Sequence, residues 1–256
     1  MIKPIGRNTI YNEDCLIGMR SIPAKSIDMI LTDLPYGSTQ CKWDVVLPFE
    51  ELWEQFNRII KDNGAIVLFG TEPFSSHLRI SNLKNYKYDW VWDKVRGTGF
   101  LNAKRQPMRN HESISVFYKK QCVYNPIKTQ GHVKKKSYRA RHLQTDVYGE
   151  MQNDCLYEST ERYPRSIQVF STDTRNSSLH PTQKPVALCE YLIKTYTNEG
   201  DLVFDSCVGS GTTAVACINT GREYLGFENN KEYYEIALKR IKEAENVNSR
   251  DDEVQE

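Results

Sequence analysis

The sequence predicts an α/β fold in which a mostly parallel, twisted sheet carries helices on both faces. Apolar runs of strand length, such as 27–33 and 201–205, alternate along the 256-residue chain with segments of helical periodicity. Both runs end in loops that contain Gly or Pro, which are signals for turns. Strands that alternate with helices favour a parallel sheet, because each connection crosses back over one of its faces. At 39% hydrophobic residues, the chain can bury the core of one large domain.

In the first half of the chain, turn residues divide the apolar runs into strands and helices. Apolar residues between Pro48 and Gly64 recur every three or four positions, which is the spacing of one helix face. The run that follows Gly64 is continuously apolar, as in a strand buried on both faces. The expected elements are a strand at 27–33, a helix at 49–60, a strand at 64–70, a helix at 72–84, and strands at 88–92 and 113–118.

The alternation resumes in the second half, after an irregular stretch at 119–183. We expect a helix at 185–196, a strand at 201–205, a helix at 212–219, a strand at 223–227 and a helix from about 231 to 245. The acidic segment 246–256 is expected to be a disordered tail.

Composition excludes several classes of protein. No apolar run approaches the ~20 residues that a membrane span needs, and the N-terminus lacks the apolar core of a signal peptide. The seven cysteines are scattered and form no C-x-x-C pair, so we expect reduced thiols and no metal site. These observations predict a cytoplasmic protein that does not enter a membrane.

The charge is distributed unevenly along the chain. The net charge is only +1, yet residues 119–142 contain eight Lys or Arg and no Asp or Glu. The other 232 residues therefore carry a net charge of −7. Such a basic segment is often only a solvated face, but here His and Tyr side chains interrupt it, which favours contact with a phosphate backbone. The residues expected to bind DNA are Lys134, Lys135, Lys136, Arg139 and Arg141.

A Gly-rich loop joins strand 201–205 to helix 212–219. It begins at Asp205 and contains Gly209-Ser210-Gly211, a pattern that lets the backbone approach a ligand closely. Glu228 closes the next strand, where an acidic residue can accept hydrogen bonds from both ribose hydroxyls of a nucleoside. No Lys follows the second Gly, so the loop is not a phosphate-binding Walker loop. The pattern favours a nucleoside cofactor over a simple tight turn.

Asp33, Leu34, Pro35 and Tyr36 follow the first predicted strand, at the edge where open α/β sheets bind ligands. Pro35 fixes its own φ and keeps Leu34 extended, so that the Leu34 carbonyl and the Asp33 carboxylate point the same way. Tyr36 adds a flat ring suited to stacking. Two acceptors beside an aromatic ring form a receptor for an amino group on a planar heterocycle. The alternative is an ordinary turn with a packed Tyr.

The segment His180-Pro181-Thr182-Gln183-Lys184-Pro185 precedes helix 185–196. Thr182 or Gln183 can cap that helix, and Pro185 suits its first turn. The helix N-terminus together with Lys184 could hold a carboxylate. The alternative is a capped helix that binds nothing.

Taken together and in this order, the three segments resemble the β group of amino-directed, S-adenosylmethionine-dependent DNA methyltransferases. In that group a D/S-P-P-Y motif comes first, a target-recognition region follows, and the H-P-T-Q-K-P and D-P-F-x-G-S-G-T-T segments lie near the C-terminus. The resemblance covers residues 8–118 and 178–245. The chain departs from the pattern at Leu34, in place of the first Pro, and at Ser206-Cys207-Val208, where Pro-Phe-Ala is common.

The resemblance implies a Rossmann-like methyltransferase fold with a circularly permuted motif order and a basic target-recognition insertion. It divides the chain into a catalytic half at 1–118, a target-recognition region at 119–178 and a cofactor-binding half at 179–245. It implies S-adenosylmethionine as cofactor and double-stranded DNA as partner, and a homodimer is compatible with it. The cofactor residues it implies are Asp14, His180, Pro181, Thr182, Lys184, Pro185, Asp205, Gly209, Gly211, Thr212, Thr213 and Glu228.

The function implied by the resemblance is methylation of a flipped-out adenine at N6, with residues 33–36 as the catalytic segment. The closest alternative is N4 methylation of cytosine, because the same receptor binds either amino group. An RNA substrate and a DNA-binding protein with an inactive methyltransferase fold are further alternatives. A dinucleotide oxidoreductase is a weaker one, because it gives no reason for residues 33–36 or 180–185.

Overall fold

The computed structural model describes residues 5–37, 44–139, 143–145, 149–151, 155–172 and 183–255. The chain divides into two compact units. The larger unit consists of Met1–Asn125 and Ser166–Glu256, and the insertion unit is Pro126–Arg165. The insertion unit lies within the region 119–178 that we expected to interrupt the α/β pattern. Its strands are β6 (Lys135–Arg139), β7 (Leu143–Thr145), β8 (Gly149–Met151) and β9 (Cys155–Ser159), with β6 paired to β9 and β7 to β8.

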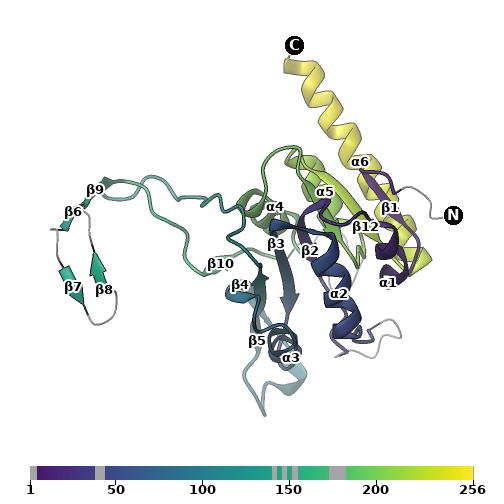
Figure 1. Ribbon diagram of the computed structural model, residues 1–256, viewed down its shortest axis with the longest axis horizontal. Helices are drawn as coiled ribbons and strands as arrows, with labels where there is room; N and C mark the ends of the chain where they lie inside the picture. Colours follow the sequence, from purple (N-terminus) through teal and green to yellow (C-terminus); the bar gives the residue numbers. More distant parts are fainter. Residues whose placement is uncertain are drawn as a thin grey trace. The chain divides into compact units, whose positions relative to one another are not determined.

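The larger unit is built on an eight-stranded sheet with the order β1-β12-β11-β2-β3-β5-β4-β10 (Figure 1). Only β5 is antiparallel to its neighbours, and all other pairings in this sheet are parallel. The strands are β1 (Thr9–Tyr11), β2 (Ile27–Thr32), β3 (Ile60–Gly70), β4 (Tyr86–Thr98), β5 (Arg109–Phe117), β10 (Ile167–Val169), β11 (Leu202–Asp205) and β12 (Glu223–Phe227). The predicted α/β class with a mostly parallel sheet is therefore confirmed.

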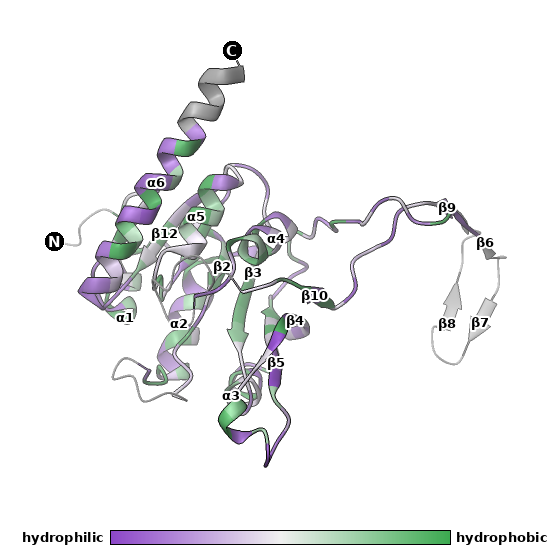
Figure 2. Ribbon diagram, turned by 180° about the vertical axis from the view of Figure 1, so that it is seen from behind, coloured by the Kyte–Doolittle hydropathy of each residue, from purple (hydrophilic) through white to green (hydrophobic). Residues whose placement is uncertain are grey.

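Two hydrophobic clusters cover the two faces of the sheet. Along β3, Ala65, Val67 and Phe69 belong to one cluster, and Ile66 and Leu68 belong to the other, as the two-residue period of a strand requires. Figure 2 shows β3 as hydrophobic along most of its length. The helices of one face are α4 (Val186–Tyr196), α5 (Thr212–Asn219) and α6 (Lys231–Gln255), and those of the other are α1 (Cys15–Gly18), α2 (Phe49–Ile59) and α3 (Phe74–Ser81).

The elements expected from the sequence are present, with two differences at the edges of the sheet. The strands β1 and β10 were not expected. Each has only three residues, which is too short for a periodicity to be read. Their pairing partners, β12 and β4, lie at least 212 and at least 69 residues away in the chain, so tertiary pairing creates these strands.

The end of the chain also differs from expectation. The segment 246–256 was expected to be a disordered tail, but helix α6 continues to Gln255. Helix α6 therefore extends about ten residues past the predicted end at 245. Within the described ranges, no helix combines the length and the apolar character that crossing a bilayer requires.

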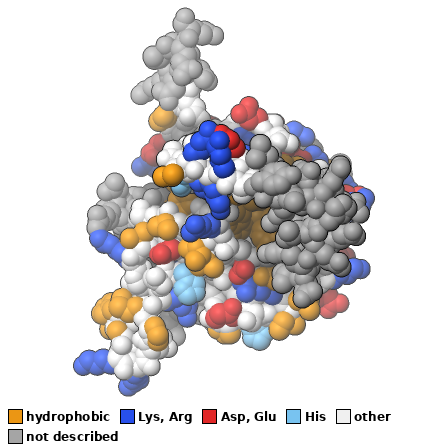
Figure 3. Space-filling model, turned by 90° about the vertical axis from the view of Figure 1, so that its left-hand side faces the viewer, with side chains coloured by type: hydrophobic (Ala, Val, Ile, Leu, Met, Phe, Trp, Pro, Cys, Tyr) orange, Lys and Arg blue, Asp and Glu red, His pale blue; other side chains and the backbone are white. Residues whose placement is uncertain are grey.

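A long hairpin arm projects from the end of the sheet between β4 and β5. Every residue from 95 to 111 is exposed, and we call this segment the β4–β5 arm. Its tip contains a short 3-10 turn, η2 (Phe100–Asn102). The arm is the lowest part of the larger unit in Figure 1, and hydrophobic side chains lie beside Lys and Arg side chains at the same height in Figure 3.

Candidate active site

The segments singled out in the sequence meet at one edge of the sheet. The strands β2, β11 and β12 are parallel, and β11 pairs with both of the others. Asp33 follows β2, the Gly-rich loop follows β11, and Glu228 follows β12. Because the carboxyl ends of parallel strands lie at the same edge, these residues surround one crevice, which is where open α/β sheets bind ligands.

The crevice is a cavity of about 740 Å³, within the size range of small-molecule sites. Its walls come from the loops after β2, β11 and β12, from α1 and from the segment before α4. The predicted residues that line it are Asp14, Asp33, Leu34, Pro35, Tyr36, Lys184, Asp205, Gly209, Thr212, Thr213 and Glu228. Residues predicted from three distant segments therefore share one cavity.

The Gly-rich loop is held against Glu228. Gly209 and Gly211 adopt φ values of 55° and 85°, in the left-handed region that favours Gly. The Gly209 amide donates a hydrogen bond of 2.7 Å to Glu228 Oε2, and the Asn230 amide donates one of 2.8 Å to Oε1. Burial raises the pKa of Glu228 above its ordinary value, and these amides partly offset that effect. The carboxylate is thus fixed by backbone donors at the cavity wall.

Asp205 and Asp14 are also positioned by backbone amides. Asp205 Oδ1 accepts a hydrogen bond of 3.0 Å from the Cys207 amide, and burial raises the pKa of Asp205 to about 6. Asp14 caps helix α1, where its Oδ1 accepts from the Leu16 and Ile17 amides at 2.9 and 3.2 Å. The cap orients Asp14 without using its second oxygen in either of these bonds.

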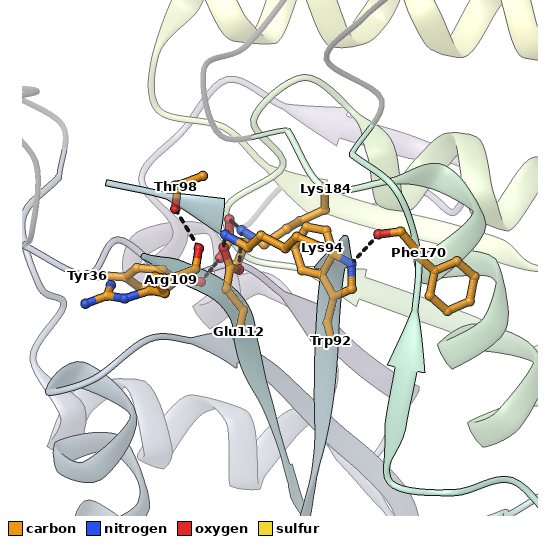
Figure 4. Close-up of polar contacts among 9 residues, drawn as sticks. Tyr36, Trp92, Lys94, Thr98, Arg109, Glu112, Phe170 and Lys184 are labelled. Carbon is orange, nitrogen blue, oxygen red and sulfur yellow. Dashed lines mark hydrogen bonds and ion pairs between the residues drawn. The ribbon is translucent and has the colours of Figure 1, made fainter. Parts of the chain in front are cut away.

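Asp33 belongs to a polar network that lines the same cavity, and Figure 4 shows its neighbours Tyr36, Glu112 and Lys184. Its Oδ1 accepts a hydrogen bond from the Tyr36 hydroxyl, and its Oδ2 accepts one of 2.5 Å from Lys184 Nζ. Burial raises the pKa of Asp33, and the nearby Lys184 ammonium opposes that shift. The pKa of Tyr36 is well above its ordinary value because of burial and the Asp33 charge, so Tyr36 remains a hydrogen-bond donor.

Lys184 is held by a second carboxylate that sequence reasoning did not select. The side chain of Lys184 is only 7% exposed, and its Nζ lies 3.3 Å from Glu112 Oε2. Glu112 also forms an ion pair with Lys94. Burial by itself would raise the pKa of Glu112, but Lys184 and Lys94 outweigh it and hold that pKa below its ordinary value. The sequence did contain a signal for this role. Glu112 directly precedes a predicted buried strand, and a carboxylate that becomes buried needs a charged partner.

Lys184 was expected at the cofactor; it lines the cavity, and its ammonium pairs with Asp33 and Glu112. Pro185 is the N-cap residue of α4, and Gly211 is the N-cap residue of α5, so both set helix starts. Thr212 and Thr213 open α5 and are buried. His180, Pro181, Thr182 and Arg141 lie outside the described residues.

The expected DNA-binding residues lie in the insertion unit. Lys134, Lys135 and Lys136 are exposed. Glu158, on the paired strand β9, forms ion pairs with Lys134 and, at 3.1 Å, with Lys136. Arg139 ends β6, and the structure describes only its backbone. The basic segment 119–142 therefore has an acidic partner on β9, which lies outside the segment and was not counted with it.

The cavity is strongly acidic. Of the described residues that line it, Lys184 carries the one ammonium group, and seven carry carboxyl groups, namely Glu13, Asp14, Asp33, Asp44, Glu112, Asp205 and Glu228. No cluster of His, Cys, Asp and Glu suited to a metal ion occurs in the part of the chain that the structure describes. Such a cavity favours a ligand with a net positive charge and with hydroxyl or amino donors.

Comparison with known proteins identifies the family. Residues 27–239 match the family model described as DNA methylase. The chain belongs to the DNA methylase family. Its sequence is 30% identical over 241 residues to the type II methyltransferase M.HpaI of Haemophilus parainfluenzae, covering 87% of this chain and 70% of that protein. It is 29% identical to the DNA adenine methyltransferase YhdJ of Escherichia coli, covering 91% of this chain and 82% of that protein.

A solved structure has the same fold as this DNA methylase. The crystal structure of the M1.HpyAVI–SAM complex has a TM-score of 0.64 and 25% sequence identity, with 91% of this chain and 98% of that chain covered. The expected methyltransferase fold is therefore confirmed. This DNA methylase is an enzyme of the class that the order of its sequence motifs predicted.

Proposed function

We propose that this DNA methylase transfers a methyl group from S-adenosylmethionine to the exocyclic N6 of adenine at a specific site in double-stranded DNA. The observation that carries the proposal is the shared cavity. Its lining includes Asp33 and the Leu34-Pro35-Tyr36 segment together with the Gly-rich loop and Glu228. An amino-group receptor and a nucleoside site on one cavity match the two reactants of such a transfer.

The acidic lining supports S-adenosylmethionine as the cofactor. S-adenosylmethionine carries a sulfonium and an ammonium against one carboxylate, so it is a net cation. Glu228, fixed by two backbone amides, would accept hydrogen bonds from the ribose hydroxyls. Asp205, Gly209 and Thr212 would hold the methionine part, and Asp14 the adenine part. A dinucleotide fits less well, because its pyrophosphate would enter a cavity that is lined by seven carboxyl groups and one ammonium group.

The chain's own residues would prepare the target amino group. The lone pair of an aromatic amine is conjugated into the ring, so that the nitrogen is a poor nucleophile. Hydrogen bonds from the amine to Asp33 and to the Leu34 carbonyl would orient that lone pair and stabilise positive charge on nitrogen as the new bond forms. A carboxylate has about four acceptor sites, and Tyr36 and Lys184 occupy two of those of Asp33.

The bound cofactor would supply an electrophilic methyl group, so positioning by the protein accounts for much of the remaining catalysis. Tyr36, which lines the cavity, would stack on the target base. Its ring is supported from behind by Phe74, with ring centroids 4.9 Å apart. Because an amino group inside a duplex cannot reach this cavity, the base must be flipped out of the helix.

Target recognition is proposed for the insertion unit, whose exposed lysines would contact phosphates, while nearby polar side chains would read base edges. A homodimer is also proposed, and sedimentation analysis of the purified chain tests it.

The decisive experiment incubates the protein with labelled S-adenosylmethionine and DNA, digests the DNA to nucleosides and identifies the labelled product. N6-methyladenine in DNA supports the proposal, and methylation mapping of the same DNA returns the recognition site. Label found only as N4-methylcytosine would replace the adenine assignment. Label found only in RNA, or absent from every substrate tested while DNA is bound, would contradict the proposed reaction. An Asp33→Asn protein provides the catalytic control.

A further inference from the structure

The β4–β5 arm exposes an apolar pair at its tip. Phe100 is 73% exposed and Leu101 is 84% exposed, although adjacent apolar side chains of this size are usually buried. The pair is held in the turn η2, where the Asn102 amide donates to the Gly99 carbonyl at 3.0 Å. The Arg105 and Gln106 amides both donate to the Asn102 carbonyl, at 2.8 and 3.0 Å. The tip is therefore a folded structure that presents two large apolar side chains to solvent.

The arm is basic as well as apolar. Between Asp93 and Glu112 the sequence contains five Lys or Arg and no Asp or Glu. Lys94 is paired with Glu112 at the base of the arm. The other four are exposed and form no ion pair with another described residue, namely Arg96, Lys104, Arg105 and Arg109. Apolar side chains flanked by unpaired cations match a phosphate backbone beside stacked bases.

The arm begins directly at the active-site network. Lys94 and Glu112 form its base, and Glu112 contacts Lys184, which contacts Asp33. Figure 4 shows Thr98 and Arg109, the next pair along the arm, beside this network. The pairing register between β4 and β5 shifts between Asp93 and Thr98, and Val95 adopts a φ of 67° there. A bulge of this kind bends a strand and re-aims it.

The arm continues from the carboxyl end of β4, and its length sets how far its tip reaches from the active-site network. Phe100 lies seven positions after Asp93, which gives a reach of up to about 23 Å along an extended strand. Neighbouring bases in one DNA strand are about 3.4 Å apart. This reach covers the base pairs that flank the target.

We infer that the β4–β5 arm is a second DNA-binding element, whose Phe100 and Leu101 insert into the duplex beside the target base while its cations contact phosphates. This inference rests on the proposed function, because a base that is flipped into the cavity leaves a gap in the stack. Apolar side chains that fill such a gap offset the cost of unstacking. The partner that the arm binds is therefore duplex DNA.

The first test needs no methyl transfer. It compares Phe100→Ala/Leu101→Ala with the wild-type protein and with Leu238→Ala/Val247→Ala, which truncates two exposed apolar side chains on α6. The probes are a random-sequence duplex and the same duplex with one abasic position. Wild type and control should bind the abasic duplex about tenfold more tightly, because the step is already open, and the arm variant should lose that preference. No preference in wild type, or a preference retained by the variant, would overturn the inference.

The second test measures methylation at the mapped site, with the target adenine either correctly paired or opposite a mismatch. The arm variant should lose about tenfold to 100-fold in rate on the paired duplex, since unstacking a step costs a few kcal/mol, and little on the mismatched one. Equal loss on both duplexes overturns the insertion role. If the arm variant is a monomer where wild type is a dimer, and its DNA binding and methylation are unchanged, then the arm contacts a second copy of the chain and the inference is overturned. Absence of N6-methyladenine in wild-type reactions contradicts the proposed function. The binding test with the abasic duplex needs no methyl transfer, so its result bears on the arm alone.

Discussion

Lys184 Nζ lies 2.5 Å from Oδ2 of Asp33, and this ion pair joins two sequence segments that are 151 residues apart. Lys184 precedes α4, Asp33 follows β2, and Glu112 on β5 holds the other side of the ammonium. The lysine of the H-P-T-Q-K-P segment therefore acts on the D-L-P-Y segment. We assign Lys184 to the orientation and ionisation of the carboxylate that would receive the target amine.

Replacing Lys184 with Met should shift the acid limb of the pH–rate profile to higher pH. Burial raises the pKa of Asp33 and Lys184 opposes that rise, so loss of the ammonium raises the pKa further. The ionised carboxylate is the acceptor form, and it is lost as pH falls through this pKa. At any pH below the pKa, the ionised fraction falls about tenfold when the pKa rises by one. The measurement is kcat/KM for DNA methylation against pH.

The control for this prediction is Lys194→Met, which removes an exposed lysine from α4, the helix that follows Lys184. Glu112, Tyr36 and Lys94 remain in both proteins, so a difference between them reports on the Asp33–Lys184 pair. An acid limb that stays in place in Lys184→Met would show that Lys184 does not set the ionisation of Asp33.

Asp33→Asn should abolish most methyl transfer and leave cofactor binding intact. The change removes the negative charge that would stabilise the developing positive charge on the target nitrogen, and losses of such preorganised groups cost about 10²- to 10³-fold in rate. Asn has nearly the same size, and Lys184 keeps its second partner, Glu112. Single-turnover methylation measures the rate, and calorimetry with S-adenosylmethionine measures binding. Near-normal turnover would remove Asp33 from the catalytic segment.

The sequence alone predicted the class of fold and the segments that form the cavity, because strand–loop–helix patterns are local. It did not predict β1 or β10, which exist only through pairing with distant strands. It also missed Glu112, whose role arises from two lysines brought to it by the sheet and by α4. The sequence also did not predict that Glu158 pairs with Lys134 and Lys136, because Glu158 becomes their neighbour only when β9 pairs with β6.

Asp205→Asn should stabilise the cofactor-free protein at neutral pH and weaken cofactor binding. The pKa of Asp205 is raised from 3.8 to about 6 by burial. The folded state therefore retains a proton that the unfolded state releases, and the free energy of unfolding falls as pH rises from about 4 to 6. A pKa difference of this size corresponds to a cost on the order of 3 kcal/mol above pH 6, which the neutral Asn avoids.

Urea unfolding of wild type and Asp205→Asn at a series of pH values measures this effect. The two stability curves should converge near pH 4 and separate above pH 6, with the variant more stable at the higher pH. Calorimetry should show weaker binding of S-adenosylmethionine, since the carboxylate that would face its ammonium is gone. Parallel stability curves would mean that burial of Asp205 carries no pH-dependent cost.

Charge changes around Glu158 should alter the salt dependence of DNA binding in opposite directions. Lys134→Glu/Lys135→Glu/Lys136→Glu should flatten the slope of log K against log salt by about 0.9 for each lost phosphate contact. Glu158→Gln should steepen it and tighten binding, because Lys134 and Lys136 lose the carboxylate that competes with DNA phosphates. Lys231→Glu/Lys239→Glu/Lys242→Glu on α6 changes the net charge equally and should leave the slope unchanged. If wild type and the three variants all have the same slope, Lys134, Lys135 and Lys136 lie on a solvated face and do not contact DNA. Other parts of the chain would then bind the DNA.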